Sequence, residues 1–228
     1  MKDFQIHDPE EVGSEFSILG MLETRAKTRA VIHEVADHIE PGMRENEAVH
    51  LTKGVLADAG MARTWHPVVV RFGANTAKTL AVQPASDVAL GENDIFFIDI
   101  GPRFGPWEGD AGETFVVGDH AEHVRCARDV KALFHEIRAL WISEGFTGAD
   151  LYRHAREAAS NAGWLLDLDV AGHRISDYPH TAIHAGTLAQ FDRRPAAMRW
   201  VAECHIRDPE GRFGAFFEDL LLPDEYYA

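Results

Sequence analysis

The sequence predicts an α+β fold in which two similar halves share a central sheet. Two helical segments followed by strands occur in residues 14–118, and the same order returns in residues 120–222. The turn-forming stretch Gly118-Asp119-His120 joins the halves, without a long linker or a low-complexity segment. With 228 residues, 46% of them hydrophobic, the chain can bury a substantial core. We therefore expect residues 1–228 to form one domain with a pseudo-two-fold repeat.

The first half begins with two helices. Residues 14–40 place apolar side chains at helical spacing, and Pro41-Gly42 ends that pattern. A second helix follows and stops at Gly60, a residue typical of helix C-termini. Runs rich in β-branched and aromatic residues then predict strands at residues 67–71, 94–100 and 114–117.

The second half repeats this order. Apolar residues recur at helical spacing from Val124 to Trp141, and a shorter helix is expected over residues 148–162, before Gly163. Strand-like segments follow at residues 165–170, 200–205 and 215–222. Each half thus contributes strands to the expected sheet and two helices to cover it.

Composition excludes several classes of function. A net charge of −15 without a basic block argues against a nucleic-acid partner. Cys126 and Cys204 are too few for a disulfide framework or a thiolate zinc site. Residues 1–13 lack the basic and apolar regions of a signal peptide, and no apolar run reaches membrane-spanning length. We therefore expect a cytoplasmic protein with no membrane partner.

Asp99 and Asp110 are the most informative residues. Asp99 lies within the apolar run 95–100, where an ionised carboxylate is unfavourable unless a cation meets it. No Lys or Arg alternates with Asp99 along this strand, and Asp110 follows eleven residues later. A single aspartate at a strand end is more often bound by backbone N–H groups. The second carboxylate, together with ligand-type residues later in the chain, favours a divalent metal ion.

Candidate ligands also occur in the second half. His173 lies in the segment AGHRISDYPH, and His180 follows seven residues later. Glu203 and Glu218 are flanked by apolar residues, as Asp99 is. Taken singly, a loop histidine is usually solvated and a glutamate beside a strand usually lies on the surface. The apolar flanks make that interpretation less natural for the two glutamates.

In this order the acidic and histidine residues resemble the ligands of the pita-bread metallopeptidases, which include methionine aminopeptidase, aminopeptidase P, prolidase and creatinase. The resemblance covers most of the chain. It is carried by the helix pair around Pro41-Gly42-Met43, by WHPVVVRFGANTA, by FIDIG and the second aspartate, by Gly172-His173 with His180, and by FGAFFEDLLLP. It implies the pita-bread fold, with a central, mostly antiparallel sheet in a catalytic domain.

The resemblance also implies a metal site. Asp110 and Glu218 are expected to bridge two divalent ions, Asp99 to chelate one of them, and His173 and Glu203 to complete the other. Four carboxylates and one imidazole form a hard site that suits Mn²⁺, Co²⁺, Fe²⁺ or Zn²⁺. Two such ions would lower the pKa of a shared water and create a nucleophile.

Catalytic and substrate-binding roles follow from the same resemblance. His66 and His180 are expected to hydrogen-bond the substrate carbonyl and the tetrahedral intermediate. Glu203 is expected to carry a proton from the water to the leaving amine. These roles predict hydrolysis of an amide or related C–N bond.

The sequence departs from the family pattern around the ligands. Arg174 replaces a glycine, Glu203 is followed by Cys204, Gly112 replaces a threonine, Glu113 replaces a basic residue, and residues 180–183 read His-Thr-Ala-Ile. We expect the guanidinium of Arg174 to lie at the cavity rim and bind a substrate carboxylate bidentately. The alternative is a structural ion pair of Arg174 with Asp177 or Glu113.

Three functions are consistent with this pattern. The leading prediction is a dinuclear metal-dependent aminopeptidase or dipeptidase of the Xaa-Pro or methionine type, acting on a short peptide. The second is a creatinase-like enzyme for a small amide, amidine or cyclic metabolite, including an iron-dependent oxidative version. The third is a catalytically inactive binding module, which the retention of all five ligands disfavours. The sequence leaves the oligomeric state open, with a homodimer as one candidate.

Overall fold

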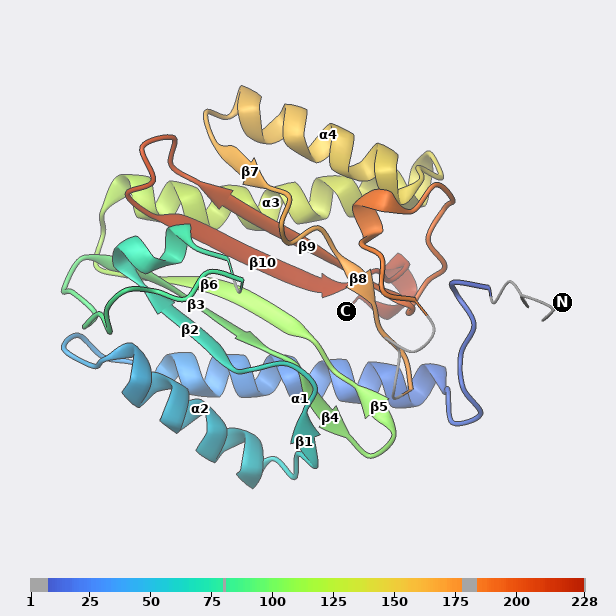
Figure 1. Cartoon of the computed structure of the whole chain (residues 1–228), viewed down its shortest axis with the longest axis horizontal. Coiled ribbons are helices and arrows are strands. Elements are labelled where there is room, and N and C mark those ends of the chain that lie inside the picture. Colours follow the sequence, from blue (N-terminus) through green and yellow to red (C-terminus); the bar gives the residue numbers. More distant parts are fainter. Residues whose placement is uncertain (1–7, 80, 178–183, 228) are drawn as a thin grey trace, which may run out of the picture.

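The computed structural model of the chain describes residues 8–79, 81–177 and 184–227 (Figure 1). The α-helices in these ranges are α1 (Ile18–Asp37), α2 (Glu45–Asp58), α3 (Ala121–Ser143) and α4 (Gly148–Asn161). The longer strands are β2 (Val69–Phe72), β3 (Asp94–Ile100), β6 (Ala111–Val117), β7 (Leu165–Asp167), β9 (Trp200–Arg207) and β10 (Gly214–Leu220). Short elements are β1 (Arg63–Thr64), β4 (Pro102–Phe104), β5 (Trp107–Glu108), β8 (His173–Arg174) and the 3-10 helices η1 (Gly73–Ala77), η3 (Leu188–Gln190) and η4 (Asp224–Tyr226).

The main sheet has the strand order β2-β3-β6-β10-β9-β7 within the described residues, with β8 also pairing with β9. All of these pairs are antiparallel. Strands of the first half occupy one side of the sheet and strands of the second half the other, so β6 and β10 meet in the middle (Figure 1). The predicted α+β class and the repeated order of helices and strands are confirmed.

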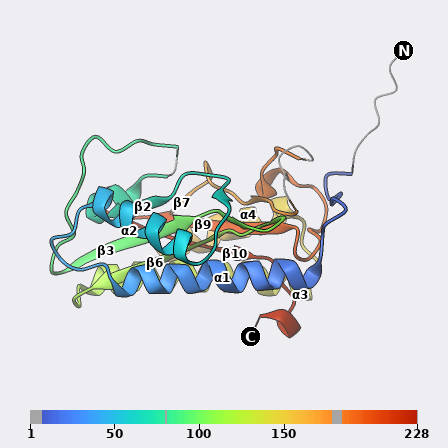
Figure 2. The same cartoon turned by 90° about the horizontal axis from the view of Figure 1, so that it is seen from below.

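The two faces of the sheet carry different kinds of side chain. In a strand, successive side chains point to opposite faces. Along β3, Phe96, Ile98 and Ile100 pack in a core cluster with residues of α1 and α2. Phe97 belongs to a separate small cluster on the other face, and Asp99 has the same parity. Figure 2 shows α1 running beneath the strands, so Phe97 and Asp99 point away from this helix.

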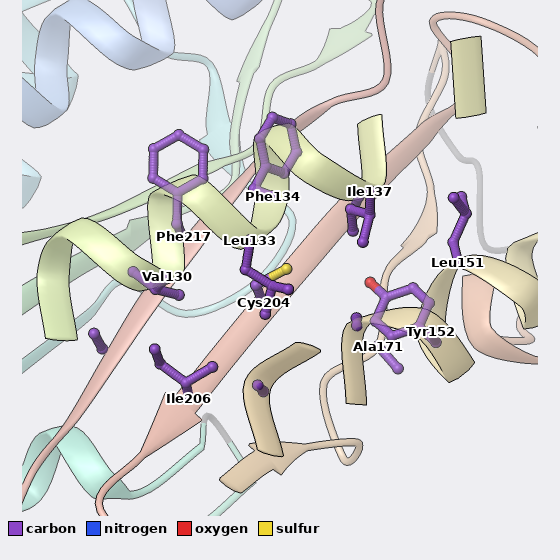
Figure 3. Packing of buried hydrophobic residues seen from close by; sticks show 14 of the residues in the cluster. Val130, Leu133, Phe134, Ile137, Leu151, Tyr152, Ala171, Cys204, Ile206 and Phe217 are labelled. Carbon is purple, nitrogen blue, oxygen red and sulfur yellow. The ribbon is translucent and has the colours of Figure 1, made fainter. Parts of the chain in front are cut away.

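The second half has an equivalent core. Residues Val130, Phe134 and Ile137 of α3 pack against β9 and β10 (Figure 3). From α4, Leu151 and Tyr152 join the same cluster. Each apolar side chain of this size contributes roughly 1.5–3 kcal/mol when it is fully buried. This packing holds β9 and β10, the two strands that carry the predicted glutamates.

Helix ends agree closely with the sequence signals. α1 begins at Ile18 rather than at residue 14, because the side chain of Ser17 accepts a bond from the N–H of Gly20 and caps the helix. Gly60 and Gly163 follow the C-caps of α2 and α4 with φ of 80° and 83°, as predicted. None of the helices in the described ranges combines the length and apolar character that a membrane span requires.

The face of the sheet that α1 and α3 cover also carries charge. Glu113 of β6 accepts bonds from Arg29 of α1 (2.6 Å) and Lys131 of α3 (2.7 Å). Asp219 of β10 accepts two bonds of 2.7 Å from Arg25 of α1. We call Glu113, Asp219 and these three cations the seam network, because it links helices of both halves to the two central strands.

Candidate metal centre

Strand register brings three carboxylates into one row. Asp99 pairs with Gly112, Gly112 with Glu218, and Glu218 with Glu203 across strands β3, β6, β10 and β9. Directly paired residues of neighbouring strands point to the same face. Gly112 leaves a gap in the row, and a Cβ there would lie 2.3 Å from the ring of Phe216 and 3.0 Å from Oε1 of Glu218. The row therefore concentrates negative charge on the face opposite to the helices.

Asp110 lies immediately before β6 and is held between two histidines. Nε2 of His66 is 3.1 Å from Oδ1 of Asp110, and Nε2 of His173 is 2.7 Å from Oδ2. Each imidazole also places its Nδ1 on the carbonyl oxygen of the following residue, at 2.8 Å for Pro67 and 2.6 Å for Arg174. Both rings are therefore fixed in orientation with Nε2 directed at the same carboxylate.

Ligand-type atoms gather in two overlapping groups. His66, Asp99 and Asp110 form one, and Asp110, His173 and Glu218 form the other, with the atoms of each group within 4.8 Å of one another. Asp110 belongs to both. This is the arrangement that a carboxylate shared by two ions requires.

Glu203 stands beside these groups rather than within them. Its Oε2 accepts a hydrogen bond from the N–H of Gly172 at 2.7 Å. The hydroxyl of Tyr152 donates to the backbone carbonyl oxygen of Glu203 at 2.8 Å and accepts from the backbone N–H of Glu203 at 2.9 Å. Gly172 has φ of 73°, and a Cβ there would lie 2.6 Å from the carbonyl oxygen of Val201. Gly172 thus orients Glu203 through its N–H, and its backbone conformation positions the next residue, His173.

The carboxylates strongly disfavour being ionised together. Burial raises the pKa of Asp99 to about 7, although the positive charge of His66 opposes the rise. Burial and the charge of Asp110 raise the pKa of Glu218 well above its usual range. Burial likewise raises the pKa of Glu203. Among the described residues, no lysine or arginine forms an ion pair with any of the four carboxylates Asp99, Asp110, Glu203 and Glu218.

The histidines take up the compensating positive charge. Burial opposes protonation of His66, but the charge of Asp99 and the hydrogen bond to Asp110 raise its pKa to about 9. Burial also opposes protonation of His173, and its hydrogen bond to Asp110 raises its pKa to about 10. For Asp110 the two imidazoles outweigh burial and lower the pKa.

These residues fit divalent metal ions. Oε1 of Glu218 is buried and has no hydrogen-bond partner among the described residues, although such an atom normally has one. Crowded carboxylates and imidazoles with fixed Nδ1 groups form an oxygen-rich donor set suited to Mn²⁺, Co²⁺, Fe²⁺ or Zn²⁺. Asp99, Asp110, His173 and Glu218 would hold the ions, with Glu203 next to them.

Arg174 does not lie where the sequence interpretation placed it. Its side chain is fully buried, and its guanidinium donates to the carbonyl oxygens of Pro9 and Glu11, each at 2.8 Å, and to those of Ile175 and Arg199. Adjacent residues of β8 point to opposite faces, so His173 at the centre directs Arg174 away from it. The prediction of a substrate-binding Arg174 is therefore wrong, as is its pairing with Asp177 or Glu113.

His180, predicted to bind substrate, lies outside the described residues. Sequence reasoning also missed two positioning residues. Nε1 of Trp65 donates to the carbonyl oxygen of Gly109 at 2.9 Å, and its ring contacts both His66 and His173. Gly101 leaves the space that His66 fills, since a Cβ there would lie 2.1 Å from that ring. The only sequence signals were the adjacency of Trp65 to His66 and the glycine in FIDIG.

Comparison with known proteins places the chain among metallopeptidases by sequence and by fold. The model of metallopeptidase family M24 matches residues 20–225. Methionine aminopeptidase of Archaeoglobus fulgidus is 20% identical over 159 residues, 69% of this chain and 52% of that protein. The structure of X-Pro aminopeptidase from Thermotoga maritima is similar with a TM-score of 0.71 at 22% identity, over 92% of this chain and 58% of that one. Methionine aminopeptidase from Thermotoga maritima gives a TM-score of 0.72 at 15% identity, over 93% and 95% of the two chains.

Fold and site together define a protein with the pita-bread fold and a candidate metal centre on one face of its sheet. The chain belongs to metallopeptidase family M24, whose model covers nearly all of it. It spans about half the length of the curated methionine aminopeptidase that it matches.

Proposed function

We propose that this protein is a dinuclear metal-dependent hydrolase that cleaves the amide bond of a short peptide, as an aminopeptidase or dipeptidase of the Xaa-Pro or methionine type. The observation that carries the proposal is the position of Asp110, whose two carboxylate oxygens each face one of the two ligand groups. Relatives described as aminopeptidases and prolidases support the peptide substrate.

The residues of this chain would take separate roles in holding the ions, transferring a proton and binding the substrate. When bound, two divalent ions supply Lewis-acid polarisation of the scissile carbonyl and an activated water. Asp99, Asp110, His173 and Glu218 hold the ions in place. Glu203 would accept a proton on Oε1 and return it to the leaving amine, because the bond from Gly172 that the described residues supply goes to Oε2. His180 would donate to the substrate carbonyl, which stays a prediction.

Metal content provides the first test. We expect metal-free protein to bind two Co²⁺ or Mn²⁺ per chain in a calorimetric titration at neutral pH. Asp110→Asn should lower the affinity of both sites by at least ~100-fold, since it weakens a ligand common to both ion sites. The surface variant His50→Ala is the matched control and should bind as wild type does. A stoichiometry well below one for the wild-type protein would rule out the proposal.

Substrate class requires a separate assay. Loaded protein should release the N-terminal residue from peptides in a panel of Met-Xaa, Xaa-Pro and other dipeptides and tripeptides, followed by mass spectrometry. Glu203→Gln should lower kcat by roughly 10²- to 10⁴-fold without abolishing metal binding. If the loaded enzyme leaves every peptide intact but hydrolyses small amides or guanidino compounds, the creatinase-like function replaces the peptidase.

A further inference from the structure

We infer that His66 is a ligand of the metal ion held by Asp99 and Asp110, rather than a residue that binds substrate. The inference rests on the proposed dinuclear site and adds a fifth protein ligand to Asp99, Asp110, His173 and Glu218. Its starting point is the equivalence of the two imidazoles at Asp110. His66 faces Oδ1 of this carboxylate as His173 faces Oδ2, and each ring is fixed through Nδ1 by the carbonyl of the next residue.

Distances at His66 fit shared coordination. Its Nε2 is 3.1 Å from Oδ1 of Asp110 and 3.5 Å from Oδ1 of Asp99. Two donors that each lie about 2.0–2.2 Å from one ion are separated by about 3–3.6 Å in tetrahedral or octahedral geometry. A histidine that serves the substrate would instead direct Nε2 away from the ligand carboxylates. His66 points into the group formed by both aspartates.

The surroundings hold His66 in this position. Its side chain is only 10% exposed, and it is packed against the backbone of Gly101, just beyond the end of β3. Trp65 contacts the rings of His66 and His173 with centroid distances of 4.5 and 5.0 Å. Its backbone N–H binds the carbonyl oxygen of Gly101 at 2.9 Å. A donor nitrogen that is aimed and immobilised in this way is what an inner ligand needs.

This assignment gives each ion one imidazole. The ion held by Asp99 would then have one imidazole nitrogen among its protein ligands, as the ion held by His173 has. Without His66, its protein ligands would all be carboxylate oxygens. Imidazole nitrogen suits Zn²⁺, Fe²⁺ and Co²⁺, whereas an all-oxygen site suits Mn²⁺. We therefore expect the Asp99 site to prefer the former ions, and His66→Ala to shift that preference toward Mn²⁺.

Counting ligated imidazoles in Co²⁺-loaded protein, without substrate, tests the inference. Each histidine bound to Co²⁺ through Nε2 keeps a proton on Nδ1, which gives a strongly shifted, solvent-exchangeable proton NMR signal. Wild-type protein should show two such signals, and His66→Ala and His173→Ala one each. The control His50→Ala should keep both. In calorimetry, His66→Ala should weaken one of two Co²⁺ sites by more than ~100-fold, beyond the usual effect of an outer-shell partner.

The outcomes separate the two proposals. Two bound ions with a single shifted imidazole signal in the wild-type protein would overturn the role of His66 and leave the dinuclear hydrolase intact. Failure of the wild-type protein to bind Co²⁺ would instead remove the proposed function. If His66→Ala does not fold, the count in the wild-type protein still decides. Gly101→Ala, whose new Cβ displaces the His66 ring, should then lose one signal while every ligand remains present.

Discussion

Gly112 shows how one residue shapes the centre. It lies between Asp99 and Glu218 in the carboxylate row, where the family pattern has a threonine. The ring of Phe216 occupies the space beside it, so any side chain at position 112 must displace this ring and crowd Glu218. The ring of Phe216 therefore fills the space that a side chain at position 112 would otherwise occupy.

Gly112→Ala should lower both stability and metal affinity. Overpacking at this site is expected to reduce the free energy of unfolding by about 1–3 kcal/mol, measured by urea denaturation. Gly54→Ala is the matched control: its Cβ meets no atom within 4 Å on α2, so it should stabilise by about 0.5–1 kcal/mol. The double variant Gly112→Ala/Phe216→Ala should recover metal affinity. If Gly112→Ala behaves like Gly54→Ala, the crowding argument is wrong.

Elements are joined across the pseudo-repeat by the seam network. Along β10, Glu218 faces the candidate metal centre and the next residue, Asp219, faces α1, because neighbouring side chains alternate. The same alternation directs Gly112 to the centre and Glu113 to the helices. The unexpected acidic residue at position 113 is therefore accounted for by Arg29 and Lys131, which reach it from helices of different halves.

Glu113→Ala should destabilise the fold without affecting metal stoichiometry. Removing the buried carboxylate takes an ion-pair partner from Lys131 and leaves Arg29 with its 3.4 Å contact to Asp219. We expect a loss of about 2–3 kcal/mol, discounted because Lys131 is 46% exposed. Asp224→Ala removes an exposed partner of Arg138 and should lose less than about 1 kcal/mol. Thermal unfolding and calorimetric Co²⁺ titration measure the two effects. Loss of metal binding by Glu113→Ala would contradict the separation of the two faces.

At the scale of the whole molecule, the centre couples stability to pH. Without metal, Asp99, His66 and His173 have folded pKa values of about 7, 9 and 10, above their unfolded values of 3.8 and 6.5. A raised pKa contributes stability that is present below the unfolded value and lost as pH rises through the folded one. The pKa of Asp110 is lowered, so its contribution is lost only in acid.

We therefore predict that metal-free protein loses thermal stability as pH rises from about 6.5 to about 10. Ions displace the protons, so the stabilisation that saturating metal provides should grow over the same range. Thermal midpoints measured in chelator and in excess Zn²⁺ or Co²⁺ test both statements. The variant His173→Ala, examined in chelator, should flatten the alkaline part of the curve. A metal-free midpoint that rises between pH 7 and 9 would contradict this coupling.

Much of the architecture could be predicted because local patterns carry it. The span Asp94–Ile100 of β3 is as expected, since its apolar run is bounded by polar turn residues. Strands β1, β4, β5 and β8 were missed, because segments of two or three residues form strands only through their partners. β6 begins at Ala111, three residues early, since pairing with β3 extends it beyond its own β-propensity.

The sequence by itself determined the order of the elements and the kinds of side chain that gather in the candidate centre. Periodicity and carboxylates within apolar runs are local properties, so Asp99 and Glu218 could be recognised without a structure. Only the tertiary structure decided which side chains meet. Strand alternation buried Arg174 away from the centre, and the packing of Trp65 against Gly101 brought His66 onto both aspartates. Such contacts depend on the register and direction of segments far apart in the chain, which no local pattern encodes.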